Sequence, residues 1–407
     1  MRRAIAAAAL LAAACAPREA QKAPAPRPAA AKPAAAPNLL AMNLGAAVVS
    51  RTAEAVLEAS ALRTIDTDPH TMWVSPPGDP QQTLVFSLPA RARLEQIGLR
   101  SGAKNELLAT GIRFDLSADG QKFTPAATLT PVAGGEQQLA RIPPTEAAFV
   151  RVNVLGGRGG YVQIGSVDAV GSLLEPVNAV SIGGCFSVNG FPASFTQRGA
   201  EVLGQIDEGA RTTLVEGGTD GRFYRFAWIR GAEYGLAAVS ITPDGSHVGG
   251  IVWHEEAIQE TQFYAPDWLG DRVPCGTTSA PVESVFRWYV GRLRHFPLFG
   301  LRFDESGKLH RGDSAATLNR VTALLSANPT VPVRFVSHEL LHSTPQENQR
   351  IAQARLDSLR EALQNSGVKL AHVTFVAVGA DKPRRDATTD LTRAMYSNID
   401  LELAVAR

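Results

Sequence analysis

Val331-Pro-Val-Arg-Phe-Val-Ser-His-Glu-Leu-Leu-His342 is the stretch that decides the fold of the C-terminal part of this 407-residue chain. Its first half alternates apolar with other side chains, a period of two that is typical of a β-strand. Pro345 follows three residues after His342 and would prevent a helix from continuing through this region. We therefore predict a strand and a loop across these residues.

The same stretch contains a competing motif, because His338-Glu-Leu-Leu-His342 fits His-Glu-x-x-His. On a helix, two such imidazoles share one face and bind zinc, and the glutamate acts as a general base. The alternative function is thus a zinc metallopeptidase using His338, Glu339, His342 and Glu361, the last at the spacing of a third ligand in some aminopeptidases. A strand would separate the imidazoles, so we expect a non-catalytic protein.

Around this stretch, residues 296–407 alternate between strand and helix patterns and predict an α/β unit of order βαβαββ. A strand is expected to start at Leu301 and Phe303, and the last strand is expected at Ile399–Leu403. Two helical stripes lie between them, formed by Leu318, Val321 and Leu324 and by Ala352, Leu356, Leu359 and Leu363.

This order resembles the OmpA-like C-terminal domain, and Asn348-Gln-Arg-Ile-Ala-Gln-Ala-Arg355 matches that family's helix motif. The resemblance implies binding of the diaminopimelate of peptidoglycan, with an Asp near its ammonium group and an Arg on its carboxylate. The implied peptidoglycan-binding residues are Arg355, Asn348 and Glu339. The family's Asp falls on Leu340, so Glu339 is the adjacent acid.

Residues 38–172 consist of short alternating runs separated by turn residues, which predicts an antiparallel, jelly-roll-like β-sandwich. The stretches Ile65–Trp73 and Ser117–Phe123 make this segment similar to the discoidin or galactose-binding-like family. The resemblance implies a candidate structural calcium site at Asp66, Asp68 and Thr71, with Thr67 where the family has Gly. It also implies an alternative function as a carbohydrate-binding or adhesin-type protein.

Residues 176–290 form a second all-β unit, for which repeated hairpins predict a small sandwich or half-barrel. Cys185 and Cys275 are an even pair that predicts a disulfide, with two unrelated buried thiols as the alternative. Such a bond closes about ninety residues and would restrain the unfolded chain by about 4 kcal/mol. The charged side chains are expected to be solvated: Arg222, Arg225, Arg230, Glu233, His254 and Glu255.

The first residues resemble a bacterial lipoprotein signal peptide over residues 1–15, ending at Cys15 as the lipidation site. Residues 16–37 are rich in Ala and Pro and predict an extended tether. Acyl chains on Cys15 would hold the protein at a membrane. We expect the outer membrane, on the face toward the periplasm.

The composition sets the remaining limits. Forty basic and thirty-nine acidic side chains leave a net charge of +1, and only 7% of residues are aromatic, so no nucleic-acid partner is expected. The sequence as a whole predicts a multi-domain, non-catalytic, lipid-anchored envelope protein that needs no cofactor. Its expected partners are the membrane, peptidoglycan or another glycan, and other envelope proteins.

Overall fold

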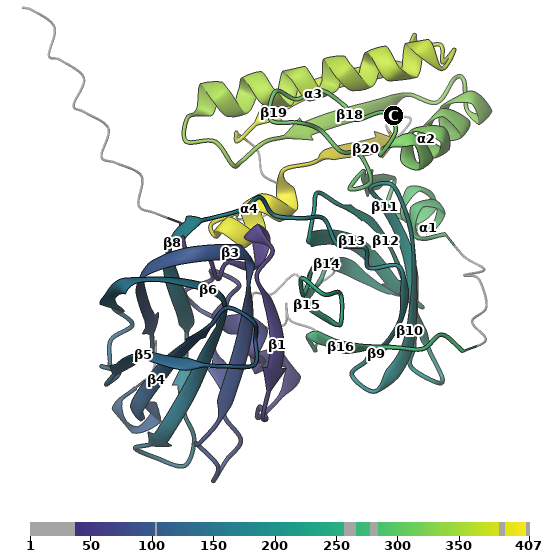
Figure 1. Cartoon of the computed structure of the whole chain (residues 1–407). Helices are drawn as coiled ribbons and strands as arrows, with labels where there is room; N and C mark the ends of the chain where they lie inside the picture. Colours follow the sequence, from purple (N-terminus) through teal and green to yellow (C-terminus); the bar gives the residue numbers. More distant parts are fainter. Residues whose placement is uncertain (1–36, 102–103, 256–265, 277–283, 382–386, 404–407) are drawn as a thin grey trace, which may run out of the picture. The chain divides into compact units, whose positions relative to one another are not determined.

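A computed structural model describes residues 37–101, 104–255, 266–276, 284–381 and 387–403. Residues 37–407 form one compact unit that contains three main β-sheets, which follow one another along the chain (Figure 1). The predictions for the signal peptide, for Cys15 and for the tether up to residue 36 lie outside the described residues. No helix in the described ranges has the length and apolarity that crossing a membrane requires.

The first sheet has the antiparallel strand order β1-β3-β6-β4-β5, and β8 also pairs with β3, in agreement with the expected β-sandwich. Its core contains the fully buried rings of Trp73, Phe86 and Phe114. The strands are β1 (Ala47–Arg51), β3 (Thr83–Arg100), β4 (Ala109–Ser117), β5 (Thr124–Leu129), β6 (Gln137–Gly157) and β8 (Ser166–Leu173), with β2 (Trp73–Val74) and β7 (Gln163–Ile164) as a separate pair. Short 3-10 helices lie beside them at η1 (Met42–Leu44), η2 (Leu57–Ala59), η3 (Ala61–Thr64) and η4 (Asn105–Leu107).

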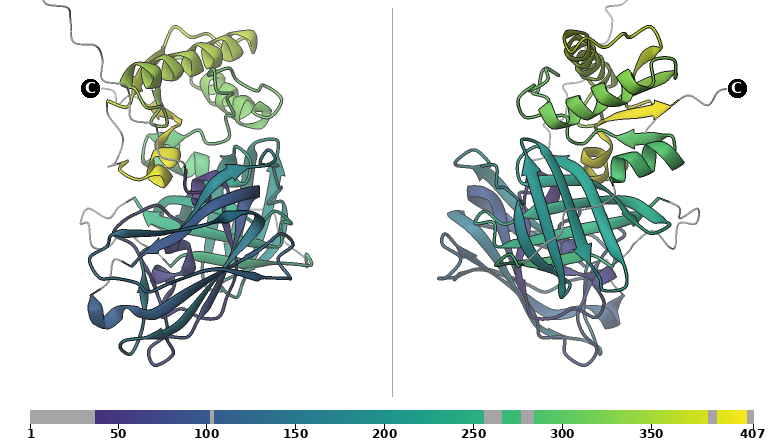
Figure 2. Two further views of the ribbon diagram at one scale, coloured as in Figure 1. Left: turned by 60° about the vertical axis from the view of Figure 1, so that its left-hand side comes forward. Right: turned by 90° about the vertical axis from the view of Figure 1, so that its right-hand side faces the viewer.

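The second sheet is a closed antiparallel barrel, which corrects the expected half-barrel or sandwich. The last strand pairs with both its predecessor and the first strand, so neither edge is left open. Aromatic rings fill its interior, among them those of Phe186, Tyr224, Phe226 and Trp228. In the right-hand view of Figure 2 its strands run side by side across the wall. They are β9 (Gly184–Val188), β10 (Phe191–Arg198), β11 (Glu201–Asp207), β12 (Thr212–Thr219), β13 (Phe223–Arg230), β14 (Glu233–Ile241), β15 (His247–His254) and β16 (Trp268–Val273).

The predicted disulfide between Cys185 and Cys275 is confirmed, with a sequence separation of 90. It lies at the seam of the barrel, because Cys185 of β9 is the register partner of Val273 in β16. The covalent bond therefore joins the two strands whose pairing closes the barrel. Helix α1 (Val285–Arg292) follows the seam.

The third sheet has the order β17-β20-β18-β19, in which β18 and β19 are parallel and the other pairs are antiparallel. Its strands are β17 (His295–Pro297), β18 (Val333–His338), β19 (Val373–Gly379) and β20 (Ile399–Leu403), with helices α2 (Ala315–Ala327), α3 (Pro345–Asn365) and α4 (Asp390–Tyr396). Two expectations are corrected. The first strand lies at residues 295–297, not 301–303, and helix α4 interrupts the predicted direct connection between the last two strands.

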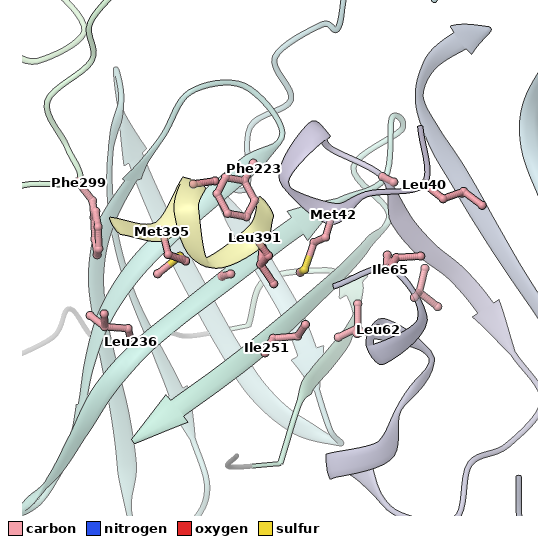
Figure 3. Close-up of a cluster of buried hydrophobic side chains, with 14 of the residues drawn as sticks. Leu40, Met42, Leu62, Ile65, Phe223, Leu236, Ile251, Phe299, Leu391 and Met395 are labelled. Atoms are coloured by element: carbon pink, nitrogen blue, oxygen red, sulfur yellow. The ribbon is translucent and has the colours of Figure 1, made fainter. Parts of the chain in front are cut away.

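The three sheets share a continuous apolar core (Figure 3). Met42 and Leu62, which precede β3, lie in one buried cluster with Leu236 and Ile251 of the barrel. Met395 of α4 belongs to the same cluster. Side chains from all three sheets are therefore removed from water together.

Candidate functional site

A cavity of about 900 Å³ lies where the C-terminal end of β18 meets the first turns of α3, beside α4. The loop of residues 340–343 lines one side of it, and Asn348 and Arg355 of α3 line another. The barrel contributes residues around the start of β13, including Arg225. Two of the three residues that the C-terminal motif singled out, Asn348 and Arg355, thus reach one cavity.

Arg355 forms an ion pair with Glu339, and their closest nitrogen and oxygen atoms are 2.6 Å apart. The side chain of Glu339 is fully buried, and that of Arg355 is 15% exposed. The second carboxylate oxygen of Glu339 accepts hydrogen bonds from the backbone N–H groups of Leu340 (3.1 Å) and Leu341 (2.9 Å). Burial lowers the pKa of Arg355, and the charge of Glu339 opposes that shift. Glu339 therefore holds the guanidinium in place as its internal counter-ion.

Asn348 fixes the loop that forms the cavity rim. Its side-chain oxygen accepts the N–H of His342 at 3.0 Å, and its amide nitrogen donates to the carbonyl of His342 at 3.2 Å. Helix α3 begins directly after this loop, with Thr344 as its N-cap and Pro345 in the first turn. Proline is tolerated in the first turn of a helix, so Pro345 begins α3 in addition to preventing a helix from continuing through the preceding loop. Leu340, the residue after Glu339, also lines the cavity.

The zinc motif is not assembled, and the predicted strand and loop are confirmed. His338 is the last residue of β18, and its Nε2 atom lies 3.6 Å from a carboxylate oxygen of Asp400. Glu361 instead pairs with Arg311 at 2.9 Å. Across the described ranges, no group of three His, Cys, Asp or Glu side chains could hold a metal ion. The helix that would bring two imidazoles together does not form, because residues 333–338 are extended.

Arg225 of β13 is the cavity residue that sequence reasoning missed. It was expected to be solvated, but it is only 8% exposed. Its Nη1 atom donates to the carbonyl oxygens of Ala394 (3.2 Å) and Ser397 (3.0 Å). Arg222, just before the same strand, is also buried, which lowers its pKa to about 10. Packing of the barrel against α4 and Phe299, which no local pattern encodes, covers Arg225.

The candidate calcium loop brings together Asp66 and Thr71, but it uses Asp68 differently. The Thr71 hydroxyl donates to Asp66 at 2.6 Å and also lies 3.3 Å and 3.4 Å from the carbonyl oxygens of Asp68 and Arg63. The Asp68 carboxylate instead accepts the N–H of His70 at 2.8 Å. Thr67 has a φ of 62°, so the loop keeps the left-handed backbone that favours glycine.

These four groups supply oxygens of the kind that a hard cation accepts, and the other three lie within 3.4 Å of the Thr71 hydroxyl. Asp66 and Thr71 would hold calcium with their side chains, and Arg63 and Asp68 with their carbonyl oxygens. Burial raises the pKa of Asp66 to about 8, partly opposed by the nearby Arg63 charge. A bound calcium ion would supply the positive charge that keeps this carboxylate ionised.

Calcium is expected to raise the melting temperature more at about pH 9 than at about pH 6. The pKa of Asp66 rises from 3.8 to about 8 on folding without metal, so the stability that its proton contributes is present below pH 3.8 and is lost as pH rises toward 8. Because calcium must displace that proton, its effect grows over the same range. Differential scanning calorimetry with calcium or a chelator measures the difference.

Asp66→Asn is the matched control, since the amide keeps the shape of the side chain but carries no charge. The calcium effect and its dependence on pH should both disappear in this variant. An equal calcium shift in Asp66→Asn and in the unmodified protein would place the ion elsewhere.

Residues 48–167 match the family model of the F5/8 type C domain. The match contains the candidate calcium loop and most of the β-sandwich, so the discoidin-like resemblance of this segment is supported. No curated protein matches this chain. These comparisons give no support to the OmpA-like resemblance of residues 296–407.

Solved structures similar to the chain include a family 32 carbohydrate-binding module (CBM) from a family 31 glycoside hydrolase of Clostridium perfringens. It is 17% identical, covers 32% of this chain and 93% of its own, and has a TM-score of 0.30. A second family 32 CBM from C. perfringens, in complex with galactose, is 20% identical, covers 31% and 94%, and has a TM-score of 0.29. The C-terminal domain of a chitobiase from Bacteroides fragilis is 21% identical, covers 32% and 96%, and also has a TM-score of 0.29.

Proposed function

We propose that this protein is a non-catalytic binding protein of the cell envelope, and that its cavity around Arg355 takes a carboxylate-bearing peptide of the cell wall. The observation that carries the proposal is the shared position of Asn348 and Arg355 on one cavity of about 900 Å³. Anchoring through a lipid on Cys15 at the outer membrane remains a prediction of the sequence.

The chemistry of the cavity favours an anionic ligand. Four arginines line it, namely Arg225, Arg302, Arg355 and Arg393, against the two carboxylates of Asp220 and Asp390. A guanidinium group binds a carboxylate through two parallel N–H donors, and burial strengthens that interaction. Since Glu339 occupies Nη1 of Arg355, a ligand carboxylate would approach the other side of the fork.

Arg355→Ala is expected to weaken binding of the tripeptide L-Ala-γ-D-Glu-meso-diaminopimelate by at least about tenfold. Loss of a charge-assisted hydrogen bond costs about 1.5–3 kcal/mol, which corresponds to that factor or more. Isothermal titration calorimetry with residues 37–407, which form one compact unit, measures the affinity.

Arg360→Ala is the control, because Arg360 lies on the same helix but pairs with Asp357 and does not line the cavity. It should bind the tripeptide as the unmodified protein does. If the unmodified protein shows no binding, or if Arg355→Ala binds equally well, the cavity is not a site for this peptide.

Binding of a neutral glycan by the β-sandwich is the second candidate function, and the F5/8 type C match of residues 48–167 favours it. A glycan array probed with residues 37–407 tests it. Signals that persist in Arg355→Ala would assign the sugar to a surface other than the cavity, and a blank array would remove this candidate.

A further inference from the structure

We propose that Arg225, supplied by barrel strand β13, is a second anchor for a ligand carboxylate in the cavity of Arg355. The ligand would then be held by the barrel and the C-terminal sheet together. This inference rests on the proposed function and adds to it a specificity residue outside the C-terminal motif.

The first argument is the position of Arg225. Arg225 lines the cavity, and its Nη1 atom donates to the carbonyl oxygens of Ala394 and Ser397 around the end of α4. The side chain also lies over the ring of Phe299, at 5.4 Å from the ring centroid. These contacts fix the guanidinium at the cavity wall, so little further ordering is needed when a ligand binds.

The second argument is charge. Arg63, which is fully buried, pairs with Asp267, and the partly buried Arg320 and Arg355 pair with Glu201 and Glu339, whereas the buried Arg222 and Arg225 have no such ion pair in the described ranges. Within the described residues, no carboxylate lies within 4.0 Å of Arg225, and its Nε atom has no hydrogen-bond partner. A buried cation without a counter-ion is costly, and a ligand carboxylate would supply the missing charge.

The third argument is proximity to Arg355. The positive charge of Arg225 lowers the pKa of Arg355, whereas the negative charge of Asp220 raises it, so the three groups interact across the same space. An anion placed between the two guanidinium groups would relieve their repulsion. The ligand class that suits this arrangement is a small peptide that carries more than one carboxylate.

The test compares the tripeptide L-Ala-γ-D-Glu-meso-diaminopimelate with three derivatives, each amidated at one carboxyl group. We expect amidation of one particular carboxyl group to lower the affinity of the unmodified protein for the peptide at least about tenfold. The same amidation should lower the affinity of Arg225→Gln less than about twofold. A merely structural role of Arg225 would lower all affinities and leave the ratios between peptides unchanged.

Arg222→Gln is the matched control, because Arg222 is also buried without a carboxylate within 4.0 Å in the described ranges, yet it does not line the cavity. Arg222→Gln should show the same ratios between the affinities for the four peptides as the unmodified protein. Arg225→Lys keeps the charge but not the planar guanidinium fork, so its ratio of affinities for the tripeptide and the amidated derivative should be intermediate. This variant replaces Arg225→Gln in the test if Arg225→Gln does not fold.

Two results would overturn the inference in different ways. Unchanged ratios in Arg225→Gln and Arg225→Lys, with binding intact in the unmodified protein, would reject the role of Arg225 alone. No binding of any peptide by the unmodified protein would reject the proposed function, and this inference with it.

Discussion

Asp267→Asn is expected to lower the free energy of unfolding by about 3–5 kcal/mol, because the buried Arg63 loses its hydrogen-bonded carboxylate and keeps only Asp66, whose nearest oxygen lies 3.9 Å away. The side chains of Arg63 and Asp267 are 1% and 0% exposed, and two hydrogen bonds of 2.6 Å and 3.0 Å join them. Ser60 donates a third hydrogen bond to the carboxylate at 2.7 Å. Urea denaturation followed by circular dichroism measures the loss.

The denaturation should be measured above pH 6, where Asp267 is ionised. Burial raises the pKa of Asp267 to about 6, although the charge of Arg63 opposes that shift. The double variant Arg63→Met with Asp267→Leu should lose less than Asp267→Asn, because it removes both charges of the pair instead of one. Asp313→Asn breaks the exposed pair with Arg302 and should cost less than about 1 kcal/mol. A similarly small loss in Asp267→Asn would contradict the argument.

This ion pair also explains which features of the fold could not be predicted from the sequence. Arg63 lies in η3 and Asp267 just before β16, 204 residues apart, and no local pattern links them. Closure of the barrel likewise depends on the pairing of β9 with β16, which are distant along the chain. Hairpin periodicity encodes neighbouring strands, so it predicted the strands but not the ring that they form.

The same limit applies to the cavity. Asn348 and Arg355 could be found from a motif, because both lie on one helix at a fixed spacing. The disulfide could be predicted because only two cysteines remain after Cys15. Arg225 could not be found, since an arginine between apolar strand residues usually faces solvent, and the sequence does not show that the short helix α4, with its apolar side chains Leu391, Ala394 and Met395, packs against this strand.

Glu339→Gln is expected to lower the free energy of unfolding by about 3 kcal/mol and to raise the affinity for the tripeptide at least about fivefold. The amide can still accept the N–H groups of Leu340 and Leu341, but it no longer neutralises Arg355. The guanidinium then has a ligand carboxylate as its strongest partner, so binding no longer competes with an internal ion pair. Urea denaturation and isothermal titration calorimetry measure the two effects.

The opposite change in affinity would be equally informative. A direct contact of Glu339 with the ammonium group of diaminopimelate would instead predict weaker binding in Glu339→Gln. The buried position of Glu339 argues for the first outcome, because a fully buried carboxylate bonded to Arg355 cannot contact a ligand without moving. Glu347→Gln, which changes an exposed glutamate paired with Arg350, should alter neither stability nor affinity measurably. Stronger binding in Glu339→Gln alone would therefore identify Glu339 as an internal competitor for Arg355.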